Sequence, residues 1–129
     1  MITADQLLAH AVGDYLIQSH WMATAKTNSS WAALAHATSY TLPFVVLTRS
    51  PGALATICIT HFIIDRWRLA RVVCWAKNWL SPAGYLPWSM CKATGYPPET
   101  PPWLAVWLMI VADNTLHILI NGAAIKWMP

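Results

Sequence analysis

Charge is what this sequence has least of. Charged side chains make up 10% of its 129 residues, against about 25% in soluble domains. Hydrophobic residues reach 57%, against a usual apolar share of about 45–50%. A small soluble globule has a large surface for its volume and needs polar residues to cover it. The shortage of charge therefore argues against a soluble enzyme domain and a disordered tail, and it favours an integral membrane protein.

Other absences narrow the function further. The three cysteines form no CxxC pair and are odd in number, which argues against a disulfide framework and favours their use in packing. The eight basic residues form no stripe with interleaved aromatic residues, so we expect no nucleic-acid partner. The chain has no GxSxG and no glycine-rich phosphate loop, which disfavours covalent serine chemistry and nucleotide-driven transport. Its first residues lack a basic region and a cleavage site, so no signal peptide is expected.

Four long stretches are nearly free of charge and predict four helices, at about residues 4–26, 29–48, 52–78 and 102–127. A bilayer core about 30 Å thick needs about 20 helical residues. The sequence thus predicts an all-α integral membrane four-helix bundle, with residues 1–129 as a single domain. A proline-rich loop of over twenty residues separates the last two helices. Pro43 is expected to kink the second helix, and Pro51 to begin the third.

The basic residues predict the orientation. If the chain has four spans, six basic residues fall on one side of the membrane. The other two, Arg49 and Lys126, fall on the opposite side. The positive-inside rule then places the proline-rich loop in the cytoplasm and both termini outside it. We expect the protein in the bacterial inner (cytoplasmic) membrane, with membrane lipid as its surroundings.

Polar residues within the apolar stretches form a pattern. Each of three aspartates has a histidine four residues away, in the pairs His10–Asp14, His61–Asp65 and Asp113–His117. This spacing puts both side chains on one helix face. His36 adds an imidazole to the second helix. Because a charge at mid-membrane costs about 2.5–3.5 kcal/mol on insertion scales, such residues normally face the bundle interior and indicate a functional site.

Three explanations compete for this pattern: His–Asp ion pairs that hold the bundle together, a proton or ion pathway, and a metal site. Buried ion pairs roughly break even against apolar replacements, whereas imidazoles and carboxylates are typical ligands of zinc, manganese or iron. We therefore favour a divalent metal centre, with zinc preferred. Two ions would nearly neutralise the three aspartates. The predicted ligands are His10, Asp14, His36, His61, Asp65, Asp113 and His117. Gln18 and Asn121 continue two of these faces and would orient the ligands.

The segments LLAHAVGDYLIQSHWMA (7–23), ALAHATSY (33–40), HFIIDRWR (61–68) and ADNTLHIL (112–119) resemble the domain of unknown function family 3307, a family of small phage and bacterial proteins with several apolar helices. The resemblance covers most of the chain except the proline-rich loop, and it brings no settled function. The matching positions are His10, Gly13, Asp14, Gln18, Trp21, His36, His61, Asp65, Asp113 and His117. A weaker similarity is to inner-membrane metal-dependent hydrolases. Weaker still is the HxxxD spacing, which is similar to that of the all-helical zinc phospholipase C and P1-type nuclease fold.

Our first hypothesis is a membrane-embedded, metal-dependent hydrolase of phosphoester bonds in lipid-linked substrates. Asp14, Asp65 and Asp113 are the candidate catalytic residues, one of them as general base. Arg66 and Arg68 are the candidates for clamping a substrate phosphate.

Two alternatives stay open beside the hydrolase. One is a non-enzymatic phage or bacterial membrane protein that binds a host partner, interferes with defence or excludes superinfection. The other is a proton or ion conductor. Four helices suffice to enclose one site, while the small residues Ala32, Ala33, Ala35 and Ala37 would also allow a second copy to pack closely in a homo-oligomer.

Overall fold

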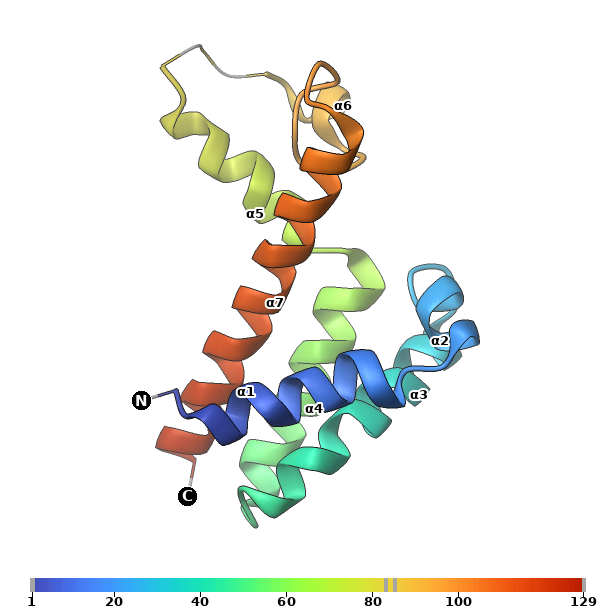
Figure 1. Cartoon of the computed structure of the whole chain (residues 1–129), viewed down its shortest axis with the longest axis vertical. Coiled ribbons are helices and arrows are strands. Elements are labelled where there is room, and N and C mark those ends of the chain that lie inside the picture. Colours follow the sequence, from blue (N-terminus) through green and yellow to red (C-terminus); the bar gives the residue numbers. More distant parts are fainter. Residues whose placement is uncertain (1, 83, 85, 129) are drawn as a thin grey trace. The chain divides into compact units, whose positions relative to one another are not determined.

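The computed structural model describes residues 2–82, 84 and 86–128, and this part of the chain is all-helical, without a strand (Figure 1). The expectation of an all-α fold is confirmed. The elements are α1 (Ala4–Ala11), the π-helical η1 (Val12–Ile17), α2 (His20–Ala25), α3 (Ser30–Thr41), the 3-10 helix η2 (Leu42–Val46), α4 (Pro51–Trp67), α5 (Ala70–Lys77), the 3-10 helix η3 (Asn78–Leu80), α6 (Trp88–Cys91) and α7 (Pro102–Trp127).

The chain divides into two compact units, and the single transmembrane domain stays a prediction. Unit 1 comprises Met1–Trp67 and His117–Pro129, and unit 2 comprises Arg68–Leu116. The predicted helix over 52–78 breaks between them, because Arg68 adopts a left-handed φ of 52°. That conformation is incompatible with a continuing right-handed helix.

The first predicted helix, at 4–26, is also interrupted. It begins as expected at Thr3, whose side chain accepts a hydrogen bond from Gln6 N. The Gln6 side chain in turn accepts a hydrogen bond from Thr3 N. This capping box satisfies two of the free N–H groups of the first turn. After one α-helical segment the chain widens into the π-helix η1, and Gln18 then becomes extended. The Ser19 side chain starts α2 by accepting from Met22 N.

Prolines set the ends of the next two helices in unit 1. α3 is capped by Ser29 and gives way to the 3-10 helix η2 at Leu42, next to Pro43. Proline has no N–H to continue the α-helical hydrogen bonds, so the predicted kink appears as a change from α-helix to 3-10 helix. α4 begins at Pro51, as predicted, and Ser50 Oγ accepts from Ala53 N.

Gly13 allows η1 to approach α3 closely within unit 1. A Cβ at this position would lie 2.6 Å from Tyr40 Cδ2 and 2.9 Å from the Tyr40 backbone oxygen. The contact places η1 beside α3, and α3 in turn packs on α4. An apolar cluster around Tyr40, Phe44 and Ile57 fills the space between these helices.

Polar side chains lie inside unit 1 and many large apolar side chains lie outside. The buried polar group consists of Gln6, His10, Asp14, His36, His61, Asp65, His117 and Asn121. By contrast, Leu16, Trp31 and Val46 are 79%, 77% and 87% exposed. A soluble monomer rarely leaves so much apolar surface in water.

One helix of the described chain, α7, is by its length and composition able to cross a bilayer. It has 26 residues, and its most apolar stretch has a mean hydropathy of 1.7. α4, with 17 residues, is shorter than the span of about 20 that a bilayer core requires. The predicted four-span bundle therefore stays a prediction, whereas the helical fold and one apolar helix of spanning length are observed.

In unit 2 the proline-rich segment folds against α5. Trp75 donates to the Leu86 backbone oxygen and packs edge-on against Trp88. A Cβ at Gly95 would collide with the Arg71 backbone oxygen, and its φ of 85° also favours glycine. Burial raises the pKa of the Cys74 and Cys91 thiols, which keeps both protonated near neutral pH.

Substituting Gly13→Ala should lower the free energy of unfolding by about 1–3 kcal/mol, because the added methyl group meets backbone atoms that cannot move aside. Thermal or denaturant unfolding in detergent measures the change. Gly52→Ala is the matched control, since its Cβ would meet only Ser50 Oγ, at 3.8 Å. A Gly13→Ala protein as stable as the control would contradict the close packing of η1 on α3.

Candidate metal centre

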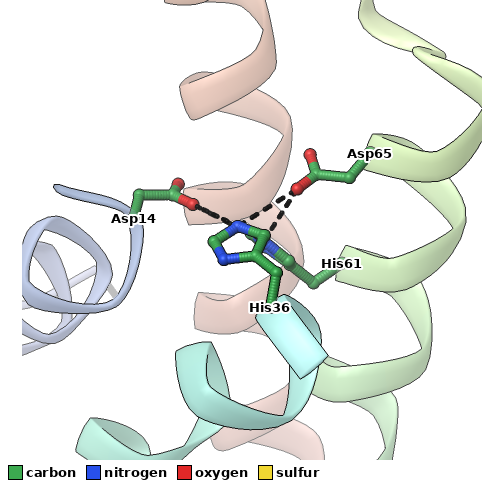
Figure 2. A group of neighbouring side chains, drawn as sticks. All are labelled: Asp14, His36, His61 and Asp65. Carbon is green, nitrogen blue, oxygen red and sulfur yellow. Dashed lines mark hydrogen bonds and ion pairs between the residues drawn. The ribbon is translucent and has the colours of Figure 1, made fainter. Parts of the chain in front are cut away.

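Four of the predicted ligands converge in the interior of unit 1. Asp14, His36, His61 and Asp65 each offer one ligand atom, and these atoms lie within 4.8 Å of one another. Figure 2 shows the four side chains pointing toward one another from three separate segments. All four are buried, with exposures of 7%, 0%, 1% and 6%. The group has the composition and geometry to hold a metal ion.

Local structure explains how each ligand reaches the centre. His61 and Asp65 lie one turn apart on α4, so both point to the same side. His36 comes from the middle of α3, which packs on α4. Asp14 comes from the π-helix η1 next to Gly13, where the backbone approaches α3 most closely. π-Bulges are frequent at functional sites because they redirect side chains.

The separations between the ligand atoms match a tetrahedron. His36 Nε2 lies 2.9 Å from His61 Nε2, 3.2 Å from Asp14 Oδ1 and 3.2 Å from Asp65 Oδ2. His61 Nε2 lies 3.5 Å from Asp14 Oδ1 and 3.1 Å from Asp65 Oδ2. Ligands bound to a tetrahedral zinc at about 2.0–2.1 Å are about 3.3–3.4 Å apart. These five separations, 2.9–3.5 Å, lie within about 0.5 Å of that tetrahedral edge.

The contact between His36 and His61 needs a proton or a cation between the two nitrogens. Two imidazole nitrogens 2.9 Å apart either share one proton or repel each other through their lone pairs. The Nδ1 atom of each ring is buried and has no hydrogen-bond partner among residues 2–82, 84 and 86–128. A cation bound by both Nε2 atoms would remove the repulsion.

Two further histidines lie near the carboxylate oxygens that point away from the centre. His10 Nδ1 lies 3.5 Å from Asp14 Oδ2, the oxygen that does not face the centre. His117 Nε2 lies 3.4 Å from Asp65 Oδ1, again the outer oxygen. Each aspartate thus directs one oxygen to the centre while the other is held by an imidazole. Partners of this kind orient metal ligands and tune their basicity.

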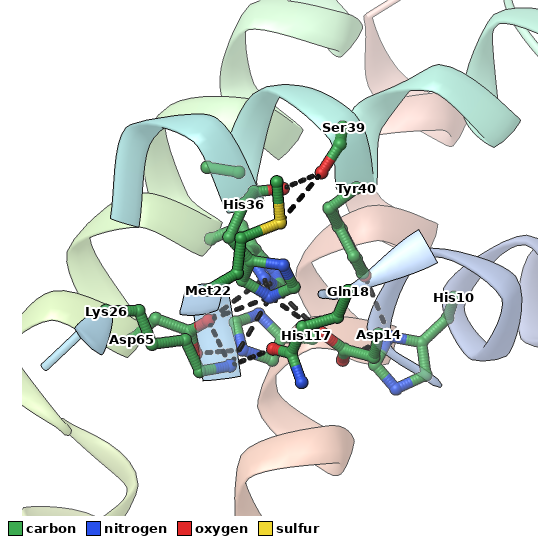
Figure 3. Close-up of polar contacts among 12 residues, drawn as sticks. His10, Asp14, Gln18, Met22, Lys26, His36, Ser39, Tyr40, Asp65 and His117 are labelled. Atoms are coloured by element: carbon green, nitrogen blue, oxygen red, sulfur yellow. Dashed lines mark hydrogen bonds and ion pairs between the residues drawn. The ribbon is translucent and has the colours of Figure 1, made fainter. Parts of the chain in front are cut away.

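Tyr40 joins these groups at the middle of unit 1. Its hydroxyl lies 2.8 Å from His10 Nδ1 and accepts from Asn121 Nδ2 at 2.6 Å. Its ring stacks on His61 with centroids 3.6 Å apart. Figure 3 shows Tyr40 reaching from α3 toward His10. Asn121 therefore contacts Tyr40 rather than a predicted ligand, and its predicted orienting role stays a prediction.

Sequence reasoning missed Lys26, which it treated only as a cytoplasmic charge. Lys26 Nζ lies 2.8 Å from Asp65 Oδ2 and 3.3 Å from His36 Nε2, and it donates to Gln18 Oε1 at 2.9 Å (Figure 3). Helical spacing cannot reveal this contact, because the chain reverses after Gln18 and α2 brings Lys26 back. Gln18, predicted to orient ligands, holds this ammonium group.

The remaining predicted residues lie elsewhere. Arg66 donates from Nη1 to the Thr27 backbone oxygen and from Nε to Ser30 Oγ. Arg68 belongs to unit 2 and donates to the Ala93 backbone oxygen. Asp113 lies on α7 in unit 2, one turn before His117. The predicted roles of Asp113 as ligand and of both arginines in phosphate binding stay predictions.

Comparison with protein families identifies the class of this chain. Residues 2–86 match the family described as "Protein of unknown function (DUF3307)". The chain belongs to this family, which confirms the resemblance noted in its sequence motifs. The match includes all four converging ligands and ends before the motif at 112–119. Comparisons with curated proteins and with solved structures give no match.

Tyr40→Phe should lower the free energy of unfolding by about 1–3 kcal/mol, because the buried Asn121 amide loses its acceptor. A double-mutant cycle with Asn121→Ala tests this contact. We expect a coupling of at least about 0.5 kcal/mol between the two positions. Fully additive effects would show that the hydrogen bond contributes nothing to stability.

Proposed function

We propose that this protein is a membrane-embedded, metal-dependent hydrolase that acts on phosphoester bonds of lipid-linked substrates. One observation carries the proposal: Asp14, His36, His61 and Asp65 present four ligand atoms at tetrahedral separations in a buried site. The charge of the site favours a bound cation. With neutral imidazoles, two carboxylates and the Lys26 ammonium leave a net charge of −1 that a cation would offset.

Zinc suits the donor set best. Two imidazole nitrogens and two carboxylate oxygens in a tetrahedral arrangement are typical of zinc, whereas manganese favours octahedral sites rich in oxygen. Catalytic zinc sites keep three protein ligands and leave one position open. We assign His36, His61 and Asp65 as the three ligands. Asp14 is the natural residue to leave, because its oxygen makes the longest contact, 3.5 Å to His61.

This assignment gives Asp14 the role of general base. A metal in the site would lower the pKa of a bound water to about 7. Asp14 Oδ1 faces the centre and would take the proton of that water, while His10 holds the other oxygen. As the water oxygen bonds to phosphorus and the bond to the leaving oxygen breaks, Asp14 would pass this proton to the leaving oxygen.

The surface of unit 1 supports a substrate with an apolar tail. An apolar groove of about 300 Å³ is lined by Ser30, Trp31, Leu34, Cys58, Ile59 and Phe62, from α3 and α4. Arg66 donates to Ser30 in this lining and follows Asp65 in the chain. The groove fits an acyl chain, and the guanidinium fits the anionic group of the same lipid. The exposed apolar residues of α3 and α4 would face membrane lipid.

Purified without a metal-affinity tag, the protein should contain about one equivalent of a divalent metal, with zinc preferred. Elemental mass spectrometry measures it directly. The variant His61→Ala/Asp65→Ala should lose the metal, because two of the three assigned ligands are gone. The matched control is Asp5→Ala/His20→Ala, which removes the same residue types from exposed positions.

A folded wild-type protein that neither contains metal nor takes up added zinc, manganese or iron would overturn the proposal. Equal metal content in the two double variants would instead show that the metal is held elsewhere.

Asp14→Asn should keep the metal and reduce phosphoester hydrolysis by about 10²–10⁴-fold, the usual contribution of a general base. The assay is phosphate release from phosphatidate and from a lipid-linked diphosphate in mixed micelles, with Asp5→Asn as the control. Full activity in Asp14→Asn would remove Asp14 from the mechanism. A metal-loaded wild type inactive on the whole panel would contradict phosphoester hydrolysis.

A second candidate, a proton pathway, is favoured by one observation. The imidazoles of His36, His61 and His117 form a continuous row, with ring centroids 4.8 Å and 4.1 Å apart. Rows of His and Asp are used as proton relays in membranes. The metal measurement separates the two candidates, since a conductor predicts a proton flux in liposomes that needs no bound metal.

A further inference from the structure

The Lys26 side chain has a position unlike that of any ligand. Its ammonium contacts Asp65 Oδ2 and His36 Nε2, on one edge of the four-ligand group. Its third neighbour, Gln18 Oε1, anchors it from outside the group. A residue placed this way touches the metal ligands without occupying the centre.

Lys26 is also the most exposed member of the cluster. Its side chain is 20% exposed, against 10% for Asp14 and 3% for Asp65. The His36 and His61 side chains are 0% and 1% exposed. Among these residues, Lys26 is therefore the one most accessible from the surroundings.

We propose that Lys26 forms an anion subsite beside the metal, which receives a non-bridging oxygen of a phosphate group. The inference rests on the proposed metal centre and names the chemistry that the site recognises. When Asp65 Oδ2 gives its electron pair to a cation, its attraction for the ammonium falls. Lys26 keeps its Gln18 contact and has N–H donors to offer. An anionic oxygen that bridges the metal and Lys26 satisfies both charges.

This arrangement predicts that phosphate and metal bind cooperatively through Lys26. Each ligand strengthens the other by the same factor, because binding free energies are linked. Removal of the ammonium should abolish this coupling. It should leave metal binding in the absence of phosphate unchanged or tighter, since one positive charge near the cation is lost.

The experiment measures zinc affinity in detergent by chelator competition, with and without inorganic phosphate. In the wild type, phosphate should tighten zinc binding by about tenfold, within the usual range of coupling between sites. Lys26→Met should lose the phosphate effect, and Lys26→Arg, which keeps the charge, should retain part of it. Lys126→Met is the control, because it removes an equal charge from an exposed position over Trp127.

Each outcome decides between the hypotheses. An equal phosphate effect in Lys26→Met and wild type overturns the anion subsite and leaves the metal centre standing. Loss of zinc in both Lys26→Met and Lys26→Arg also overturns it, and makes Lys26 a structural part of the centre. If the wild type binds no metal, the proposed function fails, and this inference fails with it.

Discussion

Two buried carboxylates, Asp14 and Asp65, set the main constraint on this structure. A carboxylate removed from water needs hydrogen bonds and a nearby positive charge, or it takes up a proton. Unit 1 places a basic side chain beside both oxygens of each residue: imidazoles lie near the outer oxygens, and the inner oxygens lie near His36, His61 and Lys26. The polar interior therefore requires that α1, η1, α3, α4 and the end of α7 come together in one arrangement.

Tyr40 links this constraint to the packing of the core. Its hydroxyl belongs to the polar network, while its ring stacks on His61 and contacts Phe44. Protein interiors are packed closely enough to transmit small displacements. A change in the apolar cluster would thus reach the imidazole of His61 through one aromatic ring. In this molecule the stability of the fold and the geometry of the site depend on the same side chain.

The sequence predicted what depends on local spacing. His61 and Asp65 lie one turn apart and face one centre, and His10 lies against Asp14, because both pairs have a spacing of four residues. The breaks in the helices escaped prediction. The left-handed Arg68 has no proline or glycine at the break, and the single Gly13 in the π-helix η1 does not by itself indicate a π-turn. Lys26 was missed for a different reason. Its contact with Asp65 depends on the extended residues between η1 and α2, which helical periodicity does not predict.

The π-helix η1 has a consequence for how this chain compares with its relatives. A π-turn holds one residue more than the α-turn it replaces, so it behaves as a single insertion within a helix. Removal of that residue would turn the segment before it by about 100° against the segment after it. His10 and Asp14 would still share a face, because residues three and four apart are neighbours on a helix, but His10 would turn relative to the segment after η1. In an alignment of the family, a one-residue gap inside 12–17 would mark chains in which α1 turns a different face toward the rest of unit 1.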